Sequence, residues 1–182
     1  MIDHVGKKCT CCHTPDVLES RCMGVVELAR PLIGFVCGAL DLLHPGHILM
    51  LEDAAAQCDY LVVGLHVDPS LERPEKNKPV QSAVERVMIL RAIKHVDSVI
   101  VYKRESDLER ILYELKPDVR VLGSDWKDKE ITAPNAAKRI HWHERDHNWS
   151  SSELRRRVFR AEYETMDPIS FDEYRKEKAG SK

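Results

Sequence analysis

The chain has 182 residues, of which 43% are hydrophobic and 32% are charged, with a formal net charge of −2 at pH 7. This composition is typical of one globular domain with short additions, and it gives no support to nucleic-acid binding, which calls for a basic excess. No apolar run approaches the roughly 20 residues of a membrane-spanning helix. The first residues carry charges but no apolar core, unlike a secretory signal, so we expect a cytoplasmic protein.

Residues 1–30 show no sustained hydrophobic period, and we interpret them as an extension before the folded domain. They contain four cysteines, Cys9, Cys11, Cys12 and Cys22. Cys9 and Cys12 have the Cys-x-x-Cys spacing of half a zinc site, but no second pair completes the set. A reduced, flexible extension is therefore preferred, and a zinc site is kept as the alternative.

From Pro31 onwards, short apolar runs alternate with amphipathic segments. Runs of this kind, rich in Val, Ile and Leu, are typical of strands that are buried on both faces of a sheet. The last of them is the weakest. The predicted strands are residues 32–36, 60–66, 96–102, 119–122 and 139–142.

Helices are predicted between and after these strands. Capping boxes of the form Ser-x-x-Glu, which satisfy the first N–H groups of a helix, begin at Ser82, Ser106 and Ser150. In the helix after Ser82, the apolar face is assigned to Val84, Val87, Met88 and Ala92. The predicted helices are residues 47–57, 82–94, 106–116 and 150–160.

The alternation predicts an α/β fold: a Rossmann-like five-stranded parallel sheet with helices on both faces. Residues 31–161 would form this nucleotide-binding domain, and residues 162–182 a charged C-terminal tail. Ligands of such folds bind beyond the carboxyl ends of the strands. The segments that follow the strands are therefore expected to meet on one rim of the sheet.

The segment after the first strand, Gly38-Ala-Leu-Asp-Leu-Leu-His-Pro-Gly-His47, places two histidines where a helix begins. A helix N-terminus offers unpaired N–H groups and a partial positive charge, which suit a phosphate. Imidazoles three positions apart, at His44 and His47, lie on one helix face and add donors. Because the chain has neither a P-loop nor a Gly-x-Gly-x-x-Gly turn, we expect a polyphosphate site built from histidines and a helix end.

This segment resembles the signature of the HxGH nucleotidylyltransferase superfamily. Three later segments resemble further motifs of that superfamily, above all those of the glycerol-3-phosphate cytidylyltransferases. Together the four motifs extend over residues 33–158, nearly the whole predicted domain. The later segments are Lys94-His-Val-Asp-Ser-Val-Ile100, Gly123-Ser-Asp-Trp126 and Arg145-Asp-His-Asn-Trp-Ser-Ser-Ser152.

The resemblance implies an enzyme that moves CMP from CTP to a small alcohol phosphate and releases pyrophosphate. His44 and His47 would contact the α- and β-phosphates, and the serines at 150–152 the β- and γ-phosphates. Lys76, on the loop after the second strand, and Arg145 would neutralise charge. Mg²⁺ would be carried mainly by the triphosphate, with no dedicated protein ligands. A homodimer is also expected from the resemblance.

The remaining site predictions have plainer alternatives. Asp97 and Asp125 are residues of a kind that also end strands and start turns, and Arg86 is as compatible with a structural ion pair as with a place in the site. The predicted nucleotide contacts are Ala39, Leu40, Pro45, Gly46, Asp97, Asp125, Asp146, Trp149, Ser150, Ser151 and Ser152, and the predicted acceptor contacts are Lys78 and Arg86.

Two other functions stay open from the sequence. The ADP-heptose-forming enzymes and the archaeal-type FAD synthetases share the two main motifs and use ATP, so an adenylyltransferase acting on a sugar phosphate or on FMN is the alternative. A non-catalytic nucleotide-binding module is the third. Leu108 stands where the glycerol-3-phosphate enzymes use a lysine, and Ala39-Leu40 where the usual motif has a hydroxyl or β-branched residue and Phe.

Overall fold

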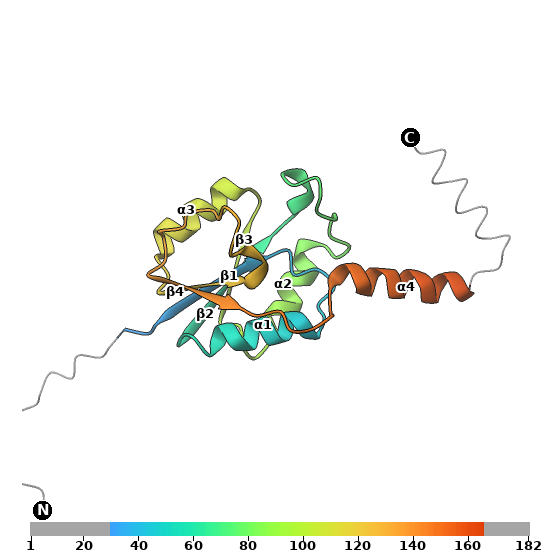
Figure 1. Cartoon of the computed structure of the whole chain (residues 1–182), viewed down its shortest axis with the longest axis horizontal. Helices are drawn as coiled ribbons and strands as arrows, with labels where there is room; N and C mark the ends of the chain where they lie inside the picture. The colour runs from blue at the N-terminus through green and yellow to red at the C-terminus, as the bar shows by residue number, and fades with distance from the viewer. Residues whose placement is uncertain (1–29, 166–182) are drawn as a thin grey trace, which may run out of the picture. The chain divides into compact units, whose positions relative to one another are not determined.

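The computed structural model describes residues 30–165 (Figure 1). The cysteines at positions 9–22, the zinc alternative and most of the predicted tail lie outside the described residues. The strands and helices are β1 Ile33–Gly38, α1 Pro45–Ala55, β2 Tyr60–His66, η1 Pro69–Leu71, α2 Ala83–Arg91, β3 Ser98–Tyr102, α3 Glu105–Leu115, β4 Val119–Gly123, η2 Ser124–Trp126, β5 Arg139–His143 and α4 Ser151–Thr165.

The sheet confirms the predicted Rossmann-like fold. Its five strands are all parallel, in the order β3-β2-β1-β4-β5. Leu51 of α1 and Leu90 of α2 share one core cluster with Val63, while Leu112 of α3 shares a second cluster with Phe35, so helices cover both faces (Figure 1). Since the chain leaves β1 towards β2 and later returns on the other side as β4, a crevice opens at the carboxyl ends of β1 and β4.

Aspartates brace the amino ends of the strands. Asp97, just before β3, accepts the N–H of Leu61 at 2.7 Å, and Asp118, just before β4, accepts the N–H of Ile33 at 2.9 Å. Both carboxylates satisfy main-chain N–H groups at the amino ends of the inner strands β1 and β2. Asp97 therefore lies at the opposite end of the sheet from the crevice, and its prediction as a nucleotide contact is wrong.

Arg86 of α2 is 1% exposed and fastens the carboxyl ends of two strands. Its guanidinium donates to the carbonyls of Ala39 at 2.6 Å, His66 at 2.9 Å and Val67 at 2.6 Å. It also donates to the carbonyl of Gln81 at 3.1 Å. With its donors engaged by main-chain carbonyls, Arg86 is a structural residue, and the predicted acceptor contact is wrong.

The same arginine explains why the predicted inner face of α2 is only partly correct: Val87 packs against the core, but Val84 and Met88 do not. Val84 and Met88 are 70% and 68% exposed, whereas Arg86 and Leu90 face the core. A charged side chain on the buried face interrupts the apolar pattern that the prediction depends on.

Two other helix ends differ from the predictions. The first turn of α3 is capped by Asp107, whose carboxylate accepts the N–H of Arg104 at 3.1 Å, so the capping box predicted at Ser106 is wrong. Helix α4 continues to Thr165, past residue 161. Within residues 30–165, no helix has both the length and the apolar content to cross a bilayer.

The turn after β1 has an unusual backbone. Leu40 and Leu42 both have a φ of 48°, the left-handed region that side chains with a Cβ rarely adopt. Leu40 is 4% exposed and belongs to the core, so packing holds this conformation in place. Asp41, between them, is turned inwards and is 5% exposed. The strained backbone at Leu40 and Leu42 thus holds the Asp41 carboxylate in its buried position.

Replacing Arg86 with Met should lower the free energy of unfolding by about 3–5 kcal/mol, because several buried carbonyls lose their donors. Urea denaturation of the purified protein measures this. Arg91→Met, on the exposed side of the same helix, is the matched control and should change stability by less than about 1 kcal/mol. Equal effects of the two substitutions would show that Arg86 does not fasten the strands.

Candidate active site

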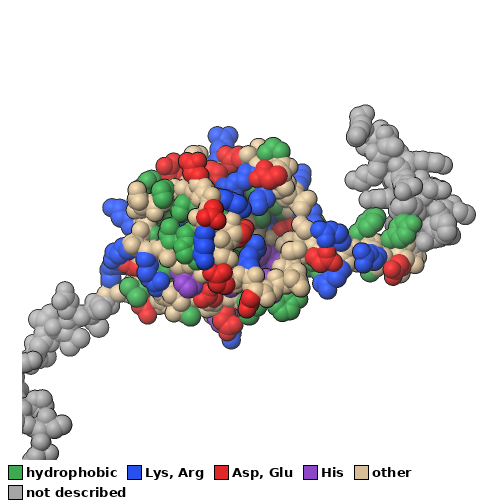
Figure 2. Space-filling view, viewed as in Figure 1, with side chains coloured by type: hydrophobic (Ala, Val, Ile, Leu, Met, Phe, Trp, Pro, Cys, Tyr) green, Lys and Arg blue, Asp and Glu red, His purple; other side chains and the backbone are tan. Residues whose placement is uncertain are grey.

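A cleft of about 390 Å³ opens at the carboxyl ends of the strands. Its walls come from the turns after β1 and β4, the loop after β2 and the start of α4. Figure 2 shows a hollow on this side of the molecule, with histidine visible between Lys and Arg side chains. The predicted site residues that line it are Ala39, Leu40, His47, Lys76, Asp125, Arg145, Ser150, Ser151 and Ser152.

His44 and His47 lie at the start of α1, as predicted. His44 is the N-cap residue, and the N–H of His47 donates to its carbonyl at 2.9 Å. The two rings are stacked, with centroids 3.9 Å apart, and the Nδ1 atoms of both are buried without a hydrogen-bond partner in the described residues. Nitrogen atoms left in this way are available to a ligand.

Burial and neighbouring charge keep both rings neutral. Burial lowers the pKa of His47 to about 3, and His44 and Arg145 act in the same direction. Burial likewise lowers the pKa of His44, helped by His147 and Arg145. Neutral imidazoles can donate one hydrogen bond each without repelling the nearby cations.

A third histidine belongs to this corner and was not predicted. The ring of His147 lies against Gly46, so closely that a Cβ at position 46 would overlap it. Both ring nitrogens of His147 are buried without a hydrogen-bond partner in the described residues. The only signal in the sequence was its position between Arg145 and Ser150, and the predicted contact at Gly46 is now explained by close packing.

The serines at the start of α4 face α1 across the cleft. Ser150 caps the helix by accepting the N–H of Glu153 at 3.1 Å, as predicted. The hydroxyl of Ser151 donates to the carbonyl of Asp41 at 3.1 Å. Two helix N-termini, each with its partial positive charge, therefore border the same cavity.

Cations and a carboxylate complete the rim. Arg145 is half exposed, and its nearest partner is Asp125 at 3.5 Å. The Asp125 carboxylate lies over Gly123, where a Cβ would collide with it. Lys76 is exposed on the loop after β2 and also lines the cleft. Lys76 and Arg145, which is held only by its 3.5 Å pair with Asp125, are thus placed to meet an anion.

Asp41 joins the three segments that form the cleft, although it was not predicted as a site residue. Its carboxylate accepts the N–H groups of Val80 at 3.0 Å and Gln81 at 2.9 Å, and it pairs with Arg155 of α4 at 2.8 Å. Burial acts to raise the pKa of Asp41, but these three donors hold it below its usual value. The carboxylate is thus a charged hub between the β1 turn, the lysine loop and α4.

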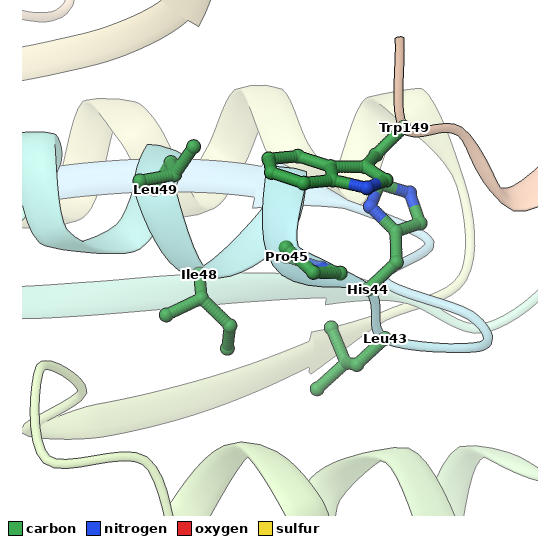
Figure 3. A pocket seen from close by; sticks show the side chains of 6 residues that line it. All are labelled: Leu43, His44, Pro45, Ile48, Leu49 and Trp149. Carbon is green, nitrogen blue, oxygen red and sulfur yellow. The ribbon is translucent and has the colours of Figure 1, made fainter. Parts of the chain in front are cut away.

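A shallow apolar pocket of about 430 Å³ lies on the outer side of His44. Figure 3 shows the Trp149 indole over the first turn of α1, beside His44 and Pro45. Trp149 is 46% exposed, so one face of the indole is accessible. His44 and the predicted contacts at Trp149 and Pro45 line this pocket rather than the cleft, and His44 reaches the cleft side only by stacking on His47.

Three further predicted residues lie away from the cleft lining. The carbonyl of Lys78 accepts from Arg155 at 2.6 Å, and Lys78 does not line the cleft. Asp146 is exposed between Arg145 and His147 and does not line the cleft. Arg86 supports the cleft from below.

The comparisons with known proteins identify the family of this chain. A family model described as cytidylyltransferase-like matches residues 35–176. The chain belongs to the cytidylyltransferase-like family. It is accordingly a nucleotidyltransferase, as the HxGH resemblance implies.

Relatives with a curated name are longer than this chain. The bifunctional protein HldE of Helicobacter pylori (strain HPAG1) is 36% identical over 148 residues, 80% of this chain and 32% of that protein. The bifunctional protein HldE of Campylobacter jejuni (strain RM1221) is 37% identical over 123 residues, 67% of this chain and 26% of that protein. The chain spans at most about a third of the length of these relatives.

Among solved structures, pantothenate synthetase from Thermus thermophilus matches with a TM-score of 0.51 and 14% identity. The match covers 81% of this chain and 66% of that one. At this identity the likeness concerns the fold alone.

The pKa of His47 predicts an acid-sensitive fold. Below the unfolded-state pKa of 6.5, the unfolded chain binds a proton that folded His47 refuses until about pH 3. Stability should therefore be full above pH 6.5 and fall by up to about 1.4 kcal/mol per pH unit below it. Urea denaturation at pH 6.5 and 5.5 should show about 1 kcal/mol less loss in His47→Gln than in the wild type. Identical losses would contradict the low pKa, which NMR titration of the ring checks directly.

Asp41→Asn should loosen the lysine loop. Loss of the charge and of one acceptor removes about 1.5–3 kcal/mol of hydrogen bonding, so amide exchange at Val80 and Gln81 should accelerate roughly 10- to 100-fold. Hydrogen exchange with NMR or mass-spectrometric detection measures this. Asp59→Asn is the control, because it removes the carboxylate that accepts the N–H of Leu32 at the far end of the sheet. In this variant the amides of Val80 and Gln81 should exchange at the wild-type rate.

Proposed function

We propose that this nucleotidyltransferase moves AMP from ATP to a sugar phosphate and releases pyrophosphate. The observation that carries the proposal is the pair of helix N-termini that border one cleft, α1 with His47, on whose ring His44 stacks, and α4 with Ser150–Ser152. Two such termini facing one another suit a chain of phosphates rather than a single anion. Lys76 and Arg145 on the rim supply the positive charge that the helices alone cannot.

The chemistry needs alignment more than a protein base. An oxygen of the acceptor phosphate attacks the α-phosphorus, the bond from that phosphorus to the bridging oxygen breaks, and pyrophosphate leaves with the electron pair. His44 and His47 would donate hydrogen bonds to the α- and β-phosphates, where charge moves during transfer. Lys76 would close over the triphosphate on its loop, and Asp41 would set the position of that loop.

Magnesium belongs to the proposal as part of the substrate. Within residues 30–165, no three His, Cys, Asp or Glu side chains gather into a set able to hold a metal ion. Mg²⁺ would enter with the triphosphate, whose oxygens and bound waters supply its octahedral shell, and it would neutralise the leaving pyrophosphate. A homodimer and a cytoplasmic location stay predictions.

The choice of ATP over CTP rests on three observations. The HldE relatives correspond to the ADP-heptose type of adenylyltransferase. Of the two segments that resemble the CTP-using enzymes, the Gly123–Trp126 turn lines the cleft, but Asp97 in the other makes a structural hydrogen bond at the far end of the sheet. Leu108, where glycerol-3-phosphate enzymes use a lysine, lines the cleft as an apolar side chain that is 3% exposed, so no cation for glycerol 3-phosphate comes from this position.

Pyrophosphate release tests the proposal. The full chain with Mg²⁺ is incubated with ATP or CTP and with heptose 1-phosphate, glycerol 3-phosphate or FMN. We expect release with ATP and heptose 1-phosphate. Release with CTP alone would reverse the choice of nucleotide, and no release with any pair would favour a binding module.

His47→Ala should reduce kcat by at least about 100-fold, because a preorganised donor to the reacting phosphates is lost. His141→Ala is the control: this histidine pairs with Asp53 on the side of α1 away from the cleft lining, and its loss should change kcat less than about threefold. Normal turnover by His47→Ala, in a variant that keeps its circular dichroism spectrum, would overturn the proposed mechanism.

A further inference from the structure

The cleft continues beyond the phosphate region into a second polar end on the α3 face of the sheet. Its residues come from six different segments, so only the folded chain brings them together. None of them belongs to the motifs that carry the family resemblance except Trp126. The lining side chains of this end include Arg73, Tyr102, Glu105, Arg120, Trp126 and Thr132.

Glu105, the first residue of α3, is the acceptor at the centre of this group. Its carboxylate accepts from the guanidinium of Arg73 at 2.6 Å and from the hydroxyl of Thr132 at 2.7 Å. A carboxylate has about four acceptor positions, so two remain for a ligand. Glu105 is about one-quarter exposed, enough to be reached from the cleft.

Arg120 supplies donors from the opposite wall. It stands in the middle of β4 between the core residues Val119 and Val121, and it is 3% exposed. One terminal nitrogen donates to the carbonyl of Thr132, but Nε is buried without a hydrogen-bond partner. No carboxylate of the described chain forms an ion pair with it. A buried guanidinium with an unused donor in a cleft is costly unless a ligand completes it.

Aromatic groups give this end its shape. The guanidinium of Arg73 lies 5.2 Å from the centre of the Trp126 ring and so fixes the indole. Tyr102 is 4% exposed, and burial raises the pKa of its hydroxyl, which therefore stays a neutral group able to donate. Donors and acceptors that alternate beside a ring match the hydroxyls and C–H faces of a sugar.

We propose that Glu105, Arg120 and Thr132 bind the hydroxyl groups of the acceptor and select a phosphorylated sugar over glycerol 3-phosphate and FMN. This rests on the proposed function, because the acceptor's phosphate must reach the nucleotide at His47. The hydroxyls nearest the carboxylate donate to Glu105, and Arg120 donates to their oxygens. FMN would bring a tricyclic ring whose apolar benzenoid part has nothing to offer two arginines and a carboxylate, whereas every face of a sugar carries hydroxyls.

The kinetic test uses Glu105→Gln, which keeps the shape but removes the charge and one acceptor. The KM for heptose 1-phosphate should rise at least tenfold, while the KM for ATP stays within about twofold. Thr132→Val should raise the acceptor KM in the same direction and keep the melting temperature. Glu144→Gln is the matched control, since it breaks an equally short ion pair to Lys127, 2.6 Å, outside the cleft lining, and should change neither KM.

Calorimetric titration of each protein with heptose 1-phosphate alone separates the two proposals. Binding to the wild type that weakens at least tenfold in Glu105→Gln supports the acceptor site even if no pyrophosphate is released, in which case only the proposed reaction fails. Turnover with unchanged acceptor KM in Glu105→Gln overturns the acceptor site and leaves the reaction standing. A wild type that neither binds nor converts the sugar phosphate overturns both.

Discussion

The buried carboxylate of Asp41 is the contact on which the cleft depends. The parallel sheet fixes the ends of β1 and β4 but not the long loop after β2, nor the helix that follows β5. Asp41, in the turn after β1, links that turn to the loop after β2 through the N–H groups of Val80 and Gln81, and to α4 through Arg155. Arg86 plays the complementary part beneath it, since its guanidinium binds carbonyls where Asp41 binds donors. A buried charge satisfied by several partners gives geometric definition that apolar contacts alone would not.

Charge in the cleft is arranged so that an anion completes it. The pKa values of His44 and His47 are lowered, and the arginines and Lys76 supply fixed positive charge. The histidines therefore act as hydrogen-bond donors, and the cations provide the attraction. This division allows the rings to stack 3.9 Å apart, a spacing that two imidazolium ions would resist. Binding of the triphosphate would then need little rearrangement of the protein.

The sequence predicted most of the fold because the strand signals were strong and local. All five strands were located. The prediction that the segments after the strands meet on one rim was also correct, because the carboxyl ends of parallel strands lie on the same side of the sheet. The failures have identifiable causes. Asp97 lies in a segment that resembles a family motif, yet its position is decided by a hydrogen bond to the N–H of Leu61, in a strand distant along the chain. Val84 and Met88 fit the helical period of apolar residues, but Arg86 occupies the buried face of α2 and leaves them exposed.

The site was predictable where motif and helix end coincide, at His44, His47 and the three serines. Asp41 and His147 stood inside the quoted motifs, and only packing revealed their contacts. Arg120 and Glu105 had no signal, because their partners come from distant parts of the chain. An arginine within an apolar strand is a pattern that a future sequence analysis can treat as a pointer towards a ligand.

The left-handed leucines on either side of Asp41 carry a further consequence. Glycine or asparagine would adopt that backbone with less strain, yet Leu40 also fills the core. At position 40, the backbone conformation thus favours glycine or asparagine, whereas core packing favours leucine. Substitutions that relax the backbone at Leu40 or Leu42 would be expected to raise stability. In such variants the backbone of the turn would no longer hold the Asp41 carboxylate in its inward position. The β1 turn is therefore a place where robustness and nucleotide chemistry compete.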